Sequence, residues 1–209
     1  MSVAEAGTAV TDRSGLREVY REPLPRAAQK VLDHLDVHCR NFIEMSPLCV
    51  LSTTGSDGRA DASPRGDPPG FVKVLDDRTL LIPDRPGNNQ VDSLQNILEH
   101  PVVGLLFFVP GMNETLRVCG SAEITSDKEL LAPLSVGGRA PLSGLKITVK
   151  DAFLHCGRAL IRSRVWDPEV RIDRSSYPTY GQVVASQIAG ADAAAIDADE
   201  DEANRTQLY

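Results

Sequence analysis

Short runs of β-forming residues, separated by turn residues, dominate the middle of the chain. Tight turns at residues 55–58, 76–78 and 110–113, which contain Gly, Asp, Asn or Pro, join successive runs. Strands joined by such turns lie antiparallel, and a small antiparallel sheet closes into a barrel to protect its edges. We therefore expect a mainly β fold with peripheral helices, in which an antiparallel barrel of six to seven strands is formed by residues 48–54, 59–63, 71–75, 79–82, 102–109, 114–124 and 145–154.

Two segments have apolar residues at helical spacing instead. Residues 27–46 predict one long amphipathic helix, unbroken or broken near Cys39, which Pro47 ends. Residues 88–100 predict a shorter helix, and Asn88 or Asn89 is suited to cap its first turn. Both helices are expected to lie outside the barrel.

The chain has 209 residues, a length typical of one domain whose core needs no disulfide or structural metal. Residues 1–15 are small and polar and predict a flexible leader. Residues 16–185 predict the folded β domain with its N-terminal helices. Residues 186–209 are rich in Asp, Glu and Ala and predict an acidic tail that is solvated or helical.

Charge and composition exclude several classes of partner. The net charge of −7 argues against nucleic acid, because binding to phosphate backbones needs a concentrated Lys and Arg surface. The longest apolar run, residues 102–110, is too short to span a bilayer, so we expect a soluble protein without a membrane partner. The four cysteines, Cys39, Cys49, Cys119 and Cys156, form no CxxC pair and are expected to be reduced thiols of a cytoplasmic protein.

Two loops combine charges with residues that fix the backbone. Residues 63–70 read Ser-Pro-Arg-Gly-Asp-Pro-Pro-Gly, and residues 83–89 read Pro-Asp-Arg-Pro-Gly-Asn-Asn just before the shorter helix. Unpaired backbone N–H groups and the helix dipole favour a phosphate at such a helix start, and Arg85 would add a charge-assisted hydrogen bond. The alternative is that both loops are plain surface turns, with local ion pairs Arg65–Asp67 and Asp84–Arg85.

Other polar residues have structural readings. His34, His38 and Cys39 lack a further ligand at suitable spacing, so no metal site is expected. His155 and Cys156 are sequence neighbours, which rarely meet as a nucleophile and its base. Trp166 is expected to be a packing residue. We therefore assign no catalytic residue from the sequence.

The run SPRGDPPGFVKVLDDRTLLIPDRPGNN, which begins residues 63–124, resembles the flavin-binding split barrels of the pyridoxamine 5′-phosphate oxidase-like family. It is most similar to a bacterial subgroup of flavin-dependent enzymes in that family. The likeness extends through residues 42–47 and 155–163 to Trp166. The resemblance implies that residues 16–185 form a split β-barrel of the FMN-binding type, and that the protein is a homodimer with flavin mononucleotide (FMN) at the subunit interface.

The resemblance also implies which residues hold the cofactor. The family's lysine that meets the flavin phosphate falls on Lys73, and its phosphate-gripping triplet falls on residues 88–90. The oxidases have basic residues where Asn89 and Gln90 stand, so either Arg85 and Arg65 supply the missing charge or the phosphate is held more weakly. The flavin ring is expected over residues 65–71, and Arg117 is a candidate contact from the other subunit. The implied cofactor-binding residues are Arg65, Phe71, Val72, Lys73, Pro83, Asp84, Arg85, Asn88, Asn89, Thr115 and Arg117.

The activity implied by the resemblance is that of an FMN-dependent oxidoreductase acting on a small organic substrate, with NADH or NADPH as a candidate electron donor. The oxidases carry a substrate-binding arginine and histidine pattern near their C-terminus, and this pattern has no match here, which argues against oxidation of pyridoxamine phosphate. The alternatives are a flavin carrier or sensor without turnover, a deazaflavin-dependent reductase on the same fold, and a structural barrel that binds no flavin.

Overall fold

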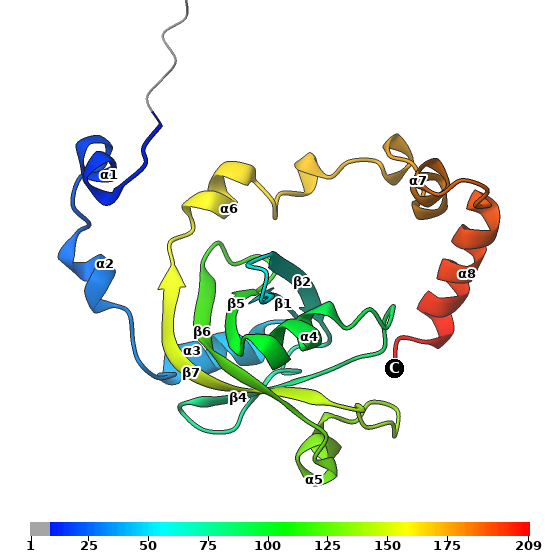
Figure 1. Ribbon diagram of the computed structural model, residues 1–209, viewed down its shortest axis with the longest axis horizontal. Coiled ribbons are helices and arrows are strands. Elements are labelled where there is room, and N and C mark those ends of the chain that lie inside the picture. Colours follow the sequence, from blue (N-terminus) through cyan, green and yellow to red (C-terminus); the bar gives the residue numbers. More distant parts are fainter. Residues whose placement is uncertain (1–8) are drawn as a thin grey trace, which may run out of the picture. The chain divides into compact units, whose positions relative to one another are not determined.

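The computed structural model describes residues 9–209, shown in Figure 1. The chain divides into two compact units, Met1–Val31 and Leu32–Tyr209. In the first unit, α1 (Arg13–Val19) and α2 (Pro25–Gln29) contain no buried residue. Residues 1–8 of the expected leader lie outside the described residues, and α1 begins within the remainder, where the Asp12 side chain accepts a hydrogen bond from the Gly15 N–H at 2.8 Å.

The second unit is built on one antiparallel sheet, whose strands within residues 32–209 follow the order β2-β1-β5-β6-β7-β4-β3 (Figure 1). This confirms the mainly β split barrel, and its seven strands agree with the six to seven expected from the sequence. The loops of interest follow β2 and β4. The strands are β1 (Leu48–Thr54), β2 (Ala60–Gly66), β3 (Lys73–Val74), β4 (Thr79–Pro83), β5 (Val102–Phe108), β6 (Thr115–Thr125) and β7 (Gly144–His155).

Alternating side chains of the strands form the core. On β5, for example, Val103, Leu105 and Phe107 are buried, and each alternates with a more exposed neighbour. A register shift at Cys119/Gly120 bends β6 against β7. A Cβ at position 120 would collide with the carbonyl oxygen of Thr148, so this bulge requires glycine.

Two separate helices replace the first helix expected from the sequence. The prediction of one helix over residues 27–46 is wrong: α2 ends at Gln29 and α3 (Val37–Met45) begins eight residues later. Between them Leu32 exchanges two backbone hydrogen bonds with Ala152 of β7, at 3.0 and 2.8 Å. Asp36 then caps α3 by accepting the Cys39 N–H at 2.8 Å. The second helix expected from the sequence is α4 (Asp92–Glu99), which packs on β1 and buries Ser93 and Ile97.

Helices also follow the barrel strands. α5 (Lys128–Leu131) lies between β6 and β7, and α6 (Arg158–Ser163), α7 (Tyr180–Gln187) and α8 (Ala193–Thr206) follow β7. α8 contains most of the acidic tail and has no buried residue of its own. Trp166 ties this region to the barrel, because its Nε1–H donates to the Met112 carbonyl oxygen at 2.7 Å. Within residues 9–209, no helix has the length and apolar character needed to cross a membrane.

Candidate functional site

The two charged loops line one cavity of the second unit. β2 continues through Pro64 and Arg65, so the first loop begins later than its composition suggested. Proline is tolerated there because β2 stands at the end of the strand order and, within residues 9–209, pairs only with β1. The second loop runs from Pro83 at the end of β4 to the start of α4.

Ion pairs connect these loops crosswise. Arg65 Nη1 lies 3.0 Å from Asp84 Oδ1, and Arg85 Nε lies 2.7 Å from Asp67 Oδ2. The second pair is nearly buried, with side-chain exposures of 17% for Arg85 and 2% for Asp67. The local pairs Arg65–Asp67 and Asp84–Arg85, the alternative from the sequence, are therefore wrong: each arginine binds the aspartate of the other loop.

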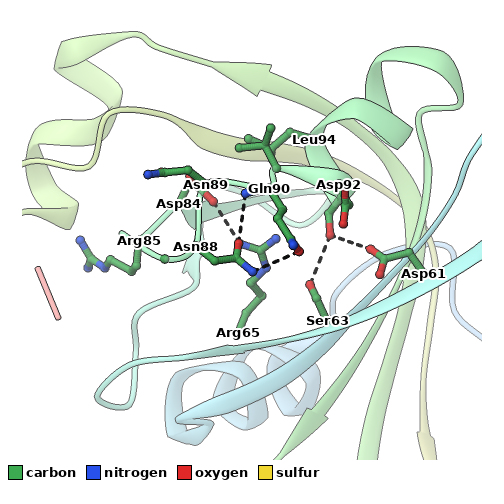
Figure 2. Close-up of a pocket in the computed structure, with 13 residues that line it drawn as sticks. Asp61, Ser63, Arg65, Asp84, Arg85, Asn88, Asn89, Gln90, Asp92 and Leu94 are labelled. Carbon is green, nitrogen blue, oxygen red and sulfur yellow. Dashed lines mark hydrogen bonds and ion pairs between the residues drawn. The ribbon is translucent and has the colours of Figure 1, made fainter. Parts of the chain in front are cut away.

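A cavity of about 250 Å³ lies between the paired loops and the start of α4. Figure 2 shows Arg65 and Asp84 directed toward each other beside Asn88, whereas the guanidinium of Arg85 points away from them. The cavity brings together five of the predicted cofactor-binding residues: Arg65, Asp84, Arg85, Asn88 and Asn89. The Nε–H of Arg65 is buried and has no hydrogen-bond partner within residues 9–209. An unsatisfied buried donor of this kind favours a ligand acceptor.

The backbone between Asn88 and Asp92 is strained. Asn89 and Val91 have positive φ angles of 57° and 53°. Asparagine tolerates this left-handed conformation, but a β-branched residue pays about 1–2 kcal/mol for it. The expected asparagine cap of α4 is wrong: Val91 is the N-cap residue and provides no side-chain hydrogen bond, while Asn88 Oδ1 accepts the Gln90 N–H at 3.1 Å. Strain of this kind is typical of ligand-binding loops.

A second cavity of about 260 Å³ adjoins the first and shares Arg65, Arg85 and Gly87 with it. It contains two more predicted residues, Phe71 and Pro83, together with Pro64 and Pro86. Three prolines and an aromatic ring therefore line this second cavity beside the two arginines. The cavities together therefore contain seven of the eleven predicted residues, five in the first and two more in the second.

The other four predicted residues lie elsewhere in this single chain. Val72 and Lys73 line a separate cavity beside α3, which contains Arg40 and Glu44. Thr115 is 8% exposed on β6. Arg117 is exposed on the same strand, where its Nε donates to Cys119 Sγ at 3.2 Å and its guanidinium lies 5.4 Å from the Phe153 ring. The roles of these four residues remain predictions.

A polar network that the sequence did not reveal fixes the start of α4. Ser93 Oγ donates to Asp61 Oδ2 at 2.8 Å, and Ser63 Oγ lies 3.3 Å from Ser93 Oγ. Thr53 of β1 also donates to Asp61, at 3.2 Å, and Asn96 donates to Thr53 at 3.0 Å. These contacts span at least eight residues of sequence, and three of the four span thirty or more, so no local motif could have indicated them. They hold the N-terminal turn of α4 against β1 and β2.

The first cavity is not simply cationic. Besides Arg65 and Arg85 it contains three carboxylates, Asp61, Asp84 and Asp92. Asp84 already neutralises Arg65, so an anionic ligand would compete with this carboxylate for the guanidinium.

The cysteines of the described structure differ in burial. Within residues 9–209 no group of three or more His, Cys, Asp and Glu side chains is placed to hold a metal ion. Burial raises the pKa of Cys39 to about 11 and that of Cys49 to about 12, so both are poor nucleophiles near neutral pH. Cys156, by contrast, is exposed.

The fold and the paired loops define a split-barrel protein with a candidate anion site beside a helix start. The family model described as Pyridoxamine 5′-phosphate oxidase matches residues 35–156, which is more than half of the chain. The chain therefore belongs to this family, and the resemblance seen in the sequence is confirmed. No curated protein matches the chain.

Solved structures are similar to somewhat more than half of the chain. A HupZ variant from Group A Streptococcus is 17% identical, covers 58% of this chain and 99% of its own, and has a TM-score of 0.49. General Stress Protein 26 from Bacillus anthracis is 18% identical, with coverages of 56% and 94% and a TM-score of 0.42. An FMN-binding protein from Syntrophomonas wolfei is 12% identical, with coverages of 56% and 83% and a TM-score of 0.44.

Proposed function

We propose that this protein binds FMN and acts as an FMN-dependent oxidoreductase on a small organic substrate. The observation that carries the proposal is the pair of loops joined crosswise by Arg65–Asp84 and Arg85–Asp67 at the start of α4. Membership of the pyridoxamine 5′-phosphate oxidase family supports a flavin as the ligand.

The chemistry of the site suits a phosphorylated cofactor. Arg65 offers its unpaired Nε–H, and Asn88 and Asn89 bring side-chain amides to the same cavity. Each cavity is smaller than the roughly 300–1,000 Å³ typical of a site for a whole small molecule. A ligand with a phosphate and a ring system would therefore use both, with the phosphate in the first cavity and the ring against Phe71 and Pro83 in the second.

When bound, FMN supplies the redox chemistry, because its isoalloxazine ring accepts and donates the electrons. The chain supplies position and electrostatics. Arg65 binds the phosphate, and Asp84, whose side chain is 27% exposed, can turn toward solvent as the phosphate takes its place. Asp67 keeps Arg85 at the boundary of the two cavities. Phe71 and the neighbouring prolines exclude water from the space assigned to the ring.

We also propose that the protein is a homodimer with the flavin at the subunit interface. Thr115 and Arg117 of β6 would then contact the cofactor bound by the partner subunit, and NADH or NADPH would serve as electron donor. The proposal is supported by the exposure of Arg117 on β6 and by family membership.

The test is the visible spectrum of the purified protein after dialysis, followed by stopped-flow reduction with NADH or NADPH. The expected result is an oxidised-flavin spectrum that persists through dialysis and bleaches when the donor is added. A persistent flavin spectrum without reduction by either donor indicates a carrier or sensor. A deazaflavin spectrum indicates a reductase of that type, and a colourless protein that FMN cannot saturate contradicts flavin binding altogether.

A further inference from the structure

Tyr209 connects the segment after α8 to the paired loops. Its phenol Oη donates to Asp67 Oδ1 at 2.7 Å, while the other carboxylate oxygen of Asp67 accepts from Arg85 Nε, also at 2.7 Å. The Arg85 guanidinium carbon lies 5.4 Å from the centre of the Tyr209 ring, within the range of a cation–π contact. Arg139 Nη1 holds the backbone of Tyr209 by donating to its carbonyl oxygen at 2.9 Å.

These contacts fix Arg85 from two directions. Asp67 is almost fully enclosed, so its carboxylate cannot exchange one partner for water without a local rearrangement. The Tyr209 ring restricts the plane of the guanidinium, and the bond through Nε leaves the terminal nitrogens of Arg85 for a ligand. Arg85 lines both cavities, so its orientation affects the whole site.

We propose that Tyr209 is a positioning residue of the FMN site, acting through Asp67 on Arg85. This inference rests on the proposed function, since it assumes that Arg85 helps to bind FMN. A purely structural role explains the contacts less well. Within residues 9–209, the last residue of the buried apolar core in sequence order is Ala152, and Tyr209 is not part of this core. Hydrogen bonding to Asp67 also raises the pKa of Tyr209, so the phenol remains a donor throughout the neutral range.

The experiment is a double-mutant cycle read out as the Kd for FMN, measured by quenching of flavin fluorescence. Tyr209→Phe keeps the ring over Arg85 and removes only the hydroxyl group. The lost hydrogen bond joins Tyr209 to Asp67 and does not touch FMN, so only part of its free energy should reach the binding free energy and FMN should bind about three- to tenfold more weakly. In the Arg85→Gln background the same change should have no further effect. Tyr180→Phe, which alters an exposed tyrosine of α7, is the matched control and should leave the Kd unchanged.

Two results would overturn the inference while the proposed function stands: FMN binding that Tyr209→Phe does not weaken, or an equal loss in both backgrounds, which would indicate a role independent of Arg85. A wild-type chain that FMN cannot saturate overturns the proposed function itself. Hydrogen–deuterium exchange without flavin tests the contact separately. Peptides covering residues 203–209 should exchange faster in Tyr209→Phe than in wild type, and unchanged exchange contradicts the contact.

Discussion

Asp67→Asn should destabilise the protein far more than loss of a comparable ion pair on its surface. The Asp67 side chain is 2% exposed and accepts two hydrogen bonds of 2.7 Å, from Arg85 and Tyr209. Removing one partner of a buried pair costs about 3–5 kcal/mol, because the remaining charge stays unpaired. The expected loss of stability is smaller than this here, because the Arg85 side chain is 17% exposed to solvent and asparagine retains one acceptor oxygen. We expect the free energy of unfolding to fall by about 2–3 kcal/mol.

Thermal unfolding followed by circular dichroism measures this loss. For a chain of this size about 1 kcal/mol corresponds to a shift of about 2–4 °C, so Asp67→Asn should lower the Tm by about 4–12 °C. The matched control is Asp33→Asn, which breaks the Asp33–Arg78 pair, also at 2.7 Å but with side-chain exposures of 71% and 49%. Solvent screens such a pair, so its loss should change the Tm little. Equal Tm shifts in the two variants would refute the argument that the paired loops are a stabilising element.

Three further predictions concern the site and the thiols. Asp84→Asn should tighten FMN binding several-fold in fluorescence titrations, because the substitution removes the carboxylate that competes with the phosphate for Arg65. Weaker binding would mean that Asp84 itself holds the cofactor. Val91→Gly should raise the free energy of unfolding in urea by up to about 1 kcal/mol, because glycine adopts the positive φ angle without strain. The control Val102→Gly, in extended β5, should lower the free energy of unfolding. If both variants are less stable than the wild type, the backbone at position 91 is not strained. The exposed Cys156 should react with Ellman's reagent at neutral pH within minutes. Cys49, whose pKa is raised by burial to about 12, should react only when the protein unfolds. Rapid reaction of both thiols would contradict the burial of Cys49.

The sequence was sufficient to predict the barrel, because its strands depend on local patterns. Alternation within β1 and β5 and the turn residues between strands are visible over windows of fewer than ten residues. The prediction of one helix over residues 27–46 is wrong for the opposite reason, because a contact with a distant residue decides the structure there. Leu32 fits the helical spacing, but its backbone pairs with Ala152, which is 120 residues away. A long-range strand contact overrides local periodicity in a way that spacing alone does not reveal.

The site could be predicted only in part, because its contacts also join residues that are far apart in the sequence. Both charged loops stood out because they combine arginine with proline and glycine, but the pairing of Arg65 with Asp84 and of Arg85 with Asp67 spans 19 and 18 residues. Local reasoning favours the nearer aspartate in each loop, and that is the wrong one. Tyr209 lies 142 residues from Asp67, and no pattern in the sequence connects them.

The most direct test of the account compares FMN with riboflavin, which lacks the phosphate, in fluorescence titrations of the wild type and of Arg65→Gln. If the paired loops hold the phosphate, the wild type should bind FMN about tenfold or more tightly than riboflavin, since a charge-assisted hydrogen bond contributes about 1.5–3 kcal/mol. Arg65→Gln should lose most of this preference while its affinity for riboflavin stays unchanged. Equal affinity of the wild type for the two flavins, or a preference that survives in Arg65→Gln, would contradict the account.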